Sequence, residues 1–443
     1  MTQHNLAKGN LFHNMLLFSL PYLLSYFLQT LYGLADLLIA GQFNGADVLS
    51  AISIGSQVMH MLTVMIVGLA MGTTVMIGRF VGAEDEAGVQ RAIGNTVSLF
   101  VMVALIATTG LLCLVQPITT ALSTPAEAVQ GANVYLRICF AGIPFIVAYN
   151  VLSSIFRGMG DSRSPMIFIA VACVVNILLD VLFMGPMQLG AAGAALGTVV
   201  AQAVSVAFAL YSIWKKDLIR IHASDLHLDG KLFRQILGIG VPIACQDGFI
   251  QISFLVITVI ANRRGLDISA AVGIVEKTIS FLFLVPSSML STVSTIAAQS
   301  IGAGDLTRAR KTLRYGIGIT VSIGLFFSIL FQFISGPFFA LFTKDPVVQE
   351  LAVQYMRTYV LDCMVAGVHF PFSGFFSASG LSILSFIHNL CSVLLVRIPG
   401  AWLATKLFPD TLYAMGLAAP AGSLLSAIFC LVFYLVLRRK GRI

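Results

Sequence analysis

The sequence predicts an all-α integral membrane protein with twelve transmembrane helices arranged as two parallel six-helix lobes. Three observations predict this fold class. First, 58% of the 443 residues are hydrophobic and only 10% are charged, whereas about 25% of the residues of a soluble protein are charged. Second, the apolar runs are continuous rather than alternating, which excludes a membrane β-barrel. Third, the chain repeats itself once.

Twelve apolar segments follow one another, each of about the 20 residues that a helix needs to cross a bilayer. They lie at 15–39, 48–77, 95–116, 131–156, 165–184, 190–214, 235–260, 269–300, 313–336, 350–376, 383–405 and 412–437. The first segment has the length of a full span and lacks a small-residue cleavage site, so we expect it to be a helix of the protein and not a cleaved signal.

The basic residues alternate between the connections. Of the 26 Lys and Arg residues, 18 fall on the side that holds both termini, 4 fall on the opposite side, and 4 lie within segments. Because cytoplasmic loops are enriched in Lys and Arg, we expect both termini in the cytoplasm and the protein in the plasma membrane. This distribution also explains the net charge of +7 without a nucleic-acid partner.

The two halves match at an offset of 220 or 221 residues. The matching stretches are Pro21 with Pro242, 81–92 with 301–312, Tyr135 and Arg137 with Tyr355 and Arg357, and 153–162 with 373–382. We therefore expect a first lobe at 1–214, a cytoplasmic linker at 215–234 and a second lobe at 235–443. Paired repeats of this kind are a common plan of transporters.

Two acids lie inside apolar segments of the first half. Asp36 and Asp180 are each about four residues from the outer end of their segment, which places them at a similar depth, about 6 Å below the boundary. Asn176 shares a helical face with Asp180, and Thr198 lies in the next segment. A charged side chain within the membrane costs about 3 kcal/mol or more, so intramembrane acids usually mark functional sites.

The side chains of Asp36, Asn176, Asp180 and Thr198 offer only oxygen atoms and at most two negative charges. Oxygen ligands suit a hard cation such as Na⁺, and two neighbouring carboxylates raise each other's affinity for a proton. The set can therefore carry Na⁺ or H⁺. In the second half, Asp36 and Asp180 have apolar or small counterparts near Ile257 and Gly400.

The second half has its own polar groups. Asp247, Gln251, Glu276 and Asp362 are candidates for binding a cationic substrate, although each acid could instead belong to a structural ion pair. His60 and His369 are single histidines in apolar runs, which favours packing over catalysis.

No pattern typical of an enzyme is present. The chain lacks a phosphate-binding P-loop and the HExxH and GxSxG motifs, and its seven cysteines are scattered singly, so neither a metal cluster nor a disulfide framework is predicted. We expect no enzymatic activity and no cofactor.

Several stretches resemble the multidrug and toxic compound extrusion (MATE) transporters. The most specific are FRGMGDSRSP at 156–165 and VNILLD at 175–180. The resemblance implies export of cationic, amphipathic compounds in exchange for Na⁺ or H⁺, through a cation site at Asp36, Asn176, Asp180, Thr198 and the carbonyl of Ala194. It also implies a helix kink at Pro21, whose missing N–H permits bending. The family's second-lobe acid has no counterpart at Ile250 or Gln251.

The sequence thus predicts a monomeric secondary antiporter whose partners are small cationic or amphipathic molecules and the lipid bilayer. The alternative is a lipid-linked oligosaccharide flippase of the same superfamily. A flippase would line its cavity with basic side chains for pyrophosphate, and only Lys277 and Arg397 lie in mid-segment.

Overall fold

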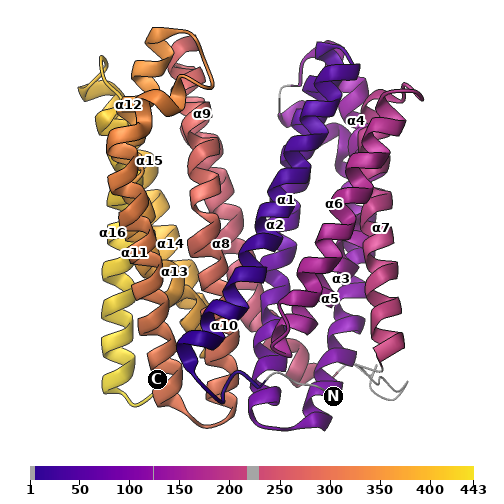
Figure 1. Ribbon diagram of the computed structural model, residues 1–443, viewed down its shortest axis with the longest axis vertical. Coiled ribbons are helices and arrows are strands. Elements are labelled where there is room, and N and C mark those ends of the chain that lie inside the picture. The colour runs from indigo at the N-terminus through magenta and orange to yellow at the C-terminus, as the bar shows by residue number, and fades with distance from the viewer. Residues whose placement is uncertain (1–4, 123, 217–228) are drawn as a thin grey trace. The chain divides into compact units, whose positions relative to one another are not determined.

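The computed structural model describes residues 5–122, 124–216 and 229–443, and within these ranges the chain is helical without any β-strand (Figure 1). Most of the predicted linker at 215–234 lies outside the described residues.

The helices of the first half follow the predicted segments; the first three are extended by several residues, and α6 and α7 match to within two residues. They are α1 (Leu11–Phe43), α2 (Ala46–Gly82), α3 (Glu86–Ala121), α4 (Ala126–Ala141), α5 (Ile143–Gly158), α6 (Arg163–Met184) and α7 (Gly190–Lys216). Helices α4 and α5 form one span that bends by 49°.

The second half repeats this order. Its helices are α8 (Gly230–Asn262), α9 (Leu266–Leu282), α10 (Leu284–Gly302), α11 (Leu306–Phe339), α12 (Pro346–Tyr359), α13 (Leu361–Ala378), α14 (Ser382–Ser392), the π-helix η2 (Val393–Arg397), α15 (Ile398–Leu407) and α16 (Tyr413–Arg439). In the described residues, eleven helical stretches are long and apolar enough to cross a membrane, and the bent α4–α5 pair is the twelfth. The prediction of twelve spans is confirmed.

The repeat extends to the helix caps. Asp85 precedes α3, and its Oδ1 accepts the backbone N–H of Gly88 at 2.8 Å. Asp305 precedes α11 in the same way, and its Oδ1 accepts the N–H of Arg308 at 2.8 Å. Such caps satisfy a backbone donor that the first turn of a helix leaves open, which explains why both helices begin before their apolar runs.

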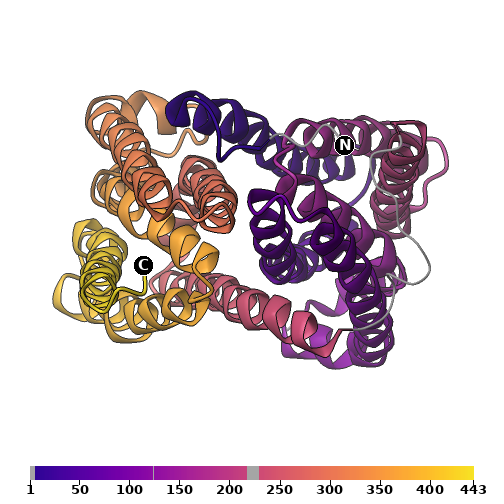
Figure 2. The ribbon, with the colours of Figure 1, turned by 90° about the horizontal axis from the view of Figure 1, so that it is seen from below.

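Backbone contacts divide the chain into two compact units. The first lobe contains Leu20–Leu237, and the second lobe contains Gly238–Ile443 together with Leu6–Ser19, which we call the amino-terminal strap. Figure 2 shows the start of α1, in indigo, beside α11, in orange. Helix α1 thus begins within the second lobe and continues into the first, and Pro21 follows this change directly.

The outer faces of both lobes are apolar. Leucine and phenylalanine side chains such as Leu38, Leu178 and Phe333 are mostly exposed, whereas Phe100, Tyr135 and Phe376 are fully buried. A soluble protein does not expose apolar surface on this scale. The exposed side chains therefore face lipid, and the protein is a multi-pass membrane protein.

The charge distribution predicts opposite labelling of two exposed positions. In a background without the seven natural cysteines, Lys440→Cys should react with an impermeant thiol reagent only from the cytoplasmic side. Arg263→Cys, in the exposed turn between α8 and α9, should react only from outside. Arg263 is a better site than Gly265, whose φ of +118° disfavours any side chain. Labelling of position 440 in intact cells would contradict the predicted orientation.

Candidate functional site

The four polar side chains that the sequence singles out in the first half meet in the first lobe. Asp36 comes from the second half of α1, Asn176 and Asp180 come from α6, and Thr198 comes from α7. Asp36, Asn176 and Asp180 are at most 3% exposed. We call these four residues the acid cluster.

Direct contacts link the members of the acid cluster. The hydroxyl of Thr198 lies 3.5 Å from Oδ2 of Asp36 and also donates to the carbonyl of Ala194 at 3.1 Å. Nδ2 of Asn176 donates to Oδ2 of Asp180 at 3.3 Å. The carboxyl groups of Asp36 and Asp180 are close enough to interact directly. The helices α1, α6 and α7 thus bring two acids together that are separated by 144 positions in the sequence.

Three oxygens of the acid cluster lack a hydrogen-bond donor of good geometry among the described residues, although they are buried. They are Oδ1 of Asp36, Oδ1 of Asn176 and Oδ1 of Asp180. An unsatisfied buried polar atom costs about 1–3 kcal/mol, and more when it is charged. A cation held between these oxygens, or a proton shared by the two carboxyl groups, would remove this cost, so the residues fit a bound Na⁺ or H⁺.

Gly197 is a member of this site that the sequence did not single out. A Cβ atom at this position would lie 2.1 Å from Oδ1 of Asp180 and 3.6 Å from Nδ2 of Asn176. Helix α7 therefore presents bare backbone to the carboxyl group, and this allows α6 and α7 to pack closely around it. The stretch GAAGAALG at 190–197 is a sequence signal for close helix packing, but the pattern does not indicate which glycine faces the acid.

Three further residues lie next to the acid cluster, and the sequence did not identify them as part of the site. Tyr32 and Gln202, each one helical turn from Asp36 and Thr198 respectively, interact with each other, and Tyr135 lies near Asp36. The ring of Tyr135 packs against α2, because a Cβ at Gly55 would lie 2.3 Å from its Cδ1 atom. The Tyr135–Arg137 pair had appeared in the sequence only as part of the repeat.

In the second lobe, Glu276 and Asp362 surround a buried arginine. The Arg397 guanidinium interacts electrostatically with both acids and donates to the hydroxyl of Tyr359 at 2.6 Å. Glu276 accepts the hydroxyl hydrogen of Thr258 at 3.2 Å, and Arg397 also lies 4.8 Å from the ring centroid of Phe254. The electrostatic interaction with Arg397 and the hydrogen bond from Thr258 favour a structural role for Glu276, one of the two readings that the sequence left open.

Asp362 is fully buried, and both its carboxylate oxygens lack a hydrogen bond of good geometry within the described residues. His369, on the same helix, is not isolated as the sequence suggested, since its ring centroid lies 5.7 Å from that of His388. Each histidine is hydrogen-bonded to a serine: Nε2 of His369 to Ser423 at 3.3 Å, and Nε2 of His388 to Ser373 at 3.0 Å. The prediction that His369 is packed and buried is confirmed.

Asp247 and Gln251 lie on α8, partly buried. Their spacing places them on the same face as Phe254 and Thr258, the two residues of α8 that contact the Glu276–Arg397 group. Asp247, Gln251, Phe254 and Thr258 thus form one stripe along α8 that ends beside Glu276 and Arg397. Lys277, by contrast, is exposed.

The fold and these clusters define a polytopic α-helical transporter with polar sites inside each lobe. The model of the MatE family matches residues 21–182 and 242–403, and the chain belongs to this family of multidrug and toxic compound extrusion transporters.

Individual relatives and solved structures are consistent with this family assignment. The chain is 26% identical to the probable multidrug resistance protein YpnP of Bacillus subtilis, covering 100% of this chain and 98% of the relative. It is also 26% identical to YoeA of the same organism, with 99% and 96% covered. A crystal structure of a MATE mutant superimposes with a TM-score of 0.93 at 21% identity, covering 100% of this chain and 99% of the other. The fold is therefore that of a MATE transporter, and multidrug efflux is the activity for which the relatives are named.

The absence of a side chain at Gly197, where α7 faces the Asp180 carboxyl group, leads to a testable prediction. Gly197→Ala should displace the Asp180 carboxyl group, because the added methyl would overlap its Oδ1 atom. We expect the folded variant to lose ion-dependent stabilisation: a ligand at 100 times its Kd raises the free energy of unfolding by about 2.7 kcal/mol, and the variant should lack this rise. The measurement is thermal unfolding of the purified protein across Na⁺ concentration and across pH.

Gly33→Ala is the matched control, because it lies on α1 near Asp36 and a Cβ there meets no atom within 4 Å. It should retain the ion response of the natural protein. An unchanged response in Gly197→Ala would contradict the packing role of Gly197.

Proposed function

We propose that this protein is a secondary antiporter of the plasma membrane that exports cationic, amphipathic compounds in exchange for inward Na⁺ or H⁺. The observation that carries the proposal is the buried acid cluster with its three unsatisfied oxygens. In this proposal both termini are cytoplasmic, no cofactor is required, and the lobes predicted at 1–214 and 235–443 work as a monomer.

Ion binding would act on the packing of α1 against α6 and α7. Two ionised carboxyl groups repel each other in a medium of low polarity, so the empty site favours a packing in which Asp36 and Asp180 separate. A bound cation or proton removes the repulsion and favours the close packing. The ion drives transport because it binds the two packings unequally, which is the only way in which a ligand can shift a conformational equilibrium.

The second lobe would supply the substrate site. The stripe of Asp247, Gln251 and Phe254 combines an acid, an amide and an aromatic ring, which suits a cation with apolar parts. Arg397 partly balances Glu276 and Asp362, so we place Asp247 at the centre of cation selection and assign Glu276 to holding the arginine.

The flippase alternative gains little support. Lys277 is exposed, and Arg397 is buried against Tyr359 and Phe254. Arg397 is therefore unavailable as part of a basic lining for pyrophosphate, and Lys277 alone would make a weak one.

The proposal predicts that the two acids of the acid cluster act as one unit. Asp36→Asn and Asp180→Asn should each abolish gradient-driven transport of a fluorescent cationic dye in proteoliposomes, with Na⁺ and H⁺ gradients imposed separately. The double variant should be about as inactive as either single variant, because effects of residues in direct contact do not add. Neutralisation imitates the occupied site, so thermal stability should be retained.

Asp47→Asn is the control, since Asp47 lies in the first turn of α2, outside the acid cluster. It should transport normally. Full Na⁺- or H⁺-driven transport by a folded double variant would overturn the mechanism.

The division of roles in the second lobe predicts different outcomes for two acids. Asp247→Asn should weaken transport of cationic dyes more than transport of neutral compounds, while leaving stability unchanged. Glu276→Gln removes a carboxylate that interacts electrostatically with the buried Arg397 and accepts the Thr258 hydroxyl hydrogen, so it should lower the unfolding temperature instead. A stable Glu276→Gln protein with selective loss of cation transport would assign Glu276 to substrate binding.

A further inference from the structure

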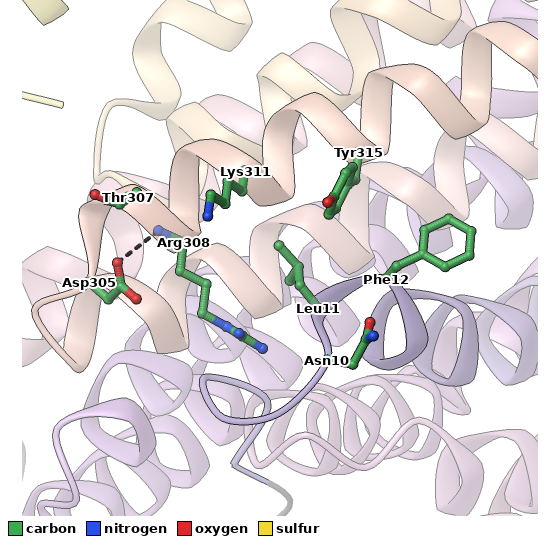
Figure 3. A pocket seen from close by; sticks show the side chains of 8 residues that line it. All are labelled: Asn10, Leu11, Phe12, Asp305, Thr307, Arg308, Lys311 and Tyr315. Atoms are coloured by element: carbon green, nitrogen blue, oxygen red, sulfur yellow. Dashed lines mark hydrogen bonds between the residues drawn. The ribbon is translucent and has the colours of Figure 1, made fainter.

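A pocket of about 310 Å³ lies in the second lobe between the amino-terminal strap and the first turns of α11 (Figure 3). Residues 10–12 form one wall, and Asp305, Thr307, Arg308, Lys311 and Tyr315 form the other. Its volume is at the lower end of the range of small-ligand sites. It is separate from the acid cluster and from the stripe on α8.

One wall of the pocket presents a row of hydrogen-bond donors. Thr307, Lys311 and Tyr315 are spaced by four residues, so they share one face of α11 at steps of about 6 Å. A hydroxyl, an ammonium and a phenol thus follow one another along the helix. All three side chains are exposed, and the ammonium of Lys311 forms no ion pair with the residues that the structure describes.

Arg308 fixes the amino-terminal strap against α11 and so shapes the pocket. Its guanidinium donates to the carbonyls of Leu6 at 2.8 Å, Gly9 at 2.9 Å and Lys8 at 3.1 Å. The left-handed conformation of Gly9, with φ of +77°, allows the strap to turn around it. Carbonyl oxygens carry no net charge, so the positive charge of Arg308 still adds to that of Lys311.

Among the residues that line the pocket, the acidic side chain is that of Asp305, and it is hydrogen-bonded to the start of α11. Asp305 caps α11 through its Oδ1 atom, which ties its carboxylate to the backbone N–H of Arg308. The pocket therefore carries two cations and one capped carboxylate, and Arg314, one turn beyond Lys311 and exposed, adds a third cation nearby. This balance favours an anionic ligand.

The apolar side of the pocket indicates where that ligand comes from. The rings of Phe12 and Tyr315 meet edge to face at 6.2 Å between centroids. Phe12 is 49% exposed, and Leu16, one turn further along the strap, is 43% exposed. Both α1 and α11 are membrane spans that begin here, so the pocket lies at a membrane–water interface, with donors beside an apolar path into the bilayer.

We propose that this pocket binds the headgroup of an anionic phospholipid, with the phosphate on Lys311 and Thr307 and an acyl chain along Phe12 and Leu16. A phosphate needs several donors and a cation, and the row on α11 supplies them. A free phosphate would use the same donors but would leave the exposed aromatic and aliphatic side chains without a role. With the termini in the cytoplasm, the lipid belongs to the inner leaflet.

Native mass spectrometry of the purified full chain tests the proposal, with phosphatidylglycerol and phosphatidylcholine titrated separately. Phosphatidylglycerol should bind more tightly than phosphatidylcholine. Lys311→Gln should weaken phosphatidylglycerol binding about fivefold, the factor that corresponds to about 1 kcal/mol for one basic side chain near a membrane surface. Lys311→Arg should retain most of the affinity, and thermal unfolding establishes that each variant is folded.

Lys440→Gln is the matched control, because it removes an exposed lysine from the end of α16, outside the pocket. Equal binding of the two lipids, or an equal loss in Lys440→Gln, would overturn the proposal in favour of unspecific surface attraction. Full displacement of the lipid by millimolar inorganic phosphate would overturn its lipid part. The binding readout does not depend on transport, so failure of the antiport mechanism would leave this result unaffected.

Discussion

Burial of two carboxyl groups at one point of the first lobe is the constraint on which the rest of this structure depends. Asp36 and Asp180 are almost completely enclosed, and a charged group in such an environment costs several kcal/mol unless it is compensated. Among the described residues, Asn176 donates to Asp180, and the hydroxyl of Thr198 lies 3.5 Å from Asp36. In the function proposed above, a cation or a proton supplies the remaining compensation, and the acid cluster is the site that binds it. The glycine at 197 is part of the same solution, because it lets α7 approach the carboxyl group of Asp180.

The second lobe meets a similar problem with an internal cation. Glu276 and Asp362 share Arg397, which lies in the π-helix η2. The span that contains η2 has 26 residues, whereas its counterpart α6 has 22. π-Helical turns are rare and often occur at functional sites. The duplicated scaffold thus carries two polar centres of different character. One is an acid pair with buried oxygens that lack donors among the described residues, and the other contains an arginine of its own.

The amino-terminal strap gives the first helix a role in both lobes. The strap is fixed to α10 and α11 through Gln299 and Arg308, while the remainder of α1 carries Asp36. Pro21, directly after the change from one lobe to the other, removes a backbone hydrogen bond and so lowers the resistance of α1 to bending. The helix that carries one acid of the acid cluster is therefore anchored at its start by the second lobe.

The sequence by itself determined the membrane class, the twelve spans and the duplication, because each rests on long runs of apolar residues, on local charge and on a constant offset. It also identified Asp36, Asn176 and Asp180, since a polar side chain in an apolar span is conspicuous. The tertiary structure alone decided which groups meet. Nothing local indicates that Gly197 faces Asp180, that Arg397 reaches Glu276 and Asp362, that His369 lies against His388, or that the strap folds onto α11. These contacts join residues from different helices, and their partners depend on how the helices rotate and pack, which the spacing along one helix does not contain.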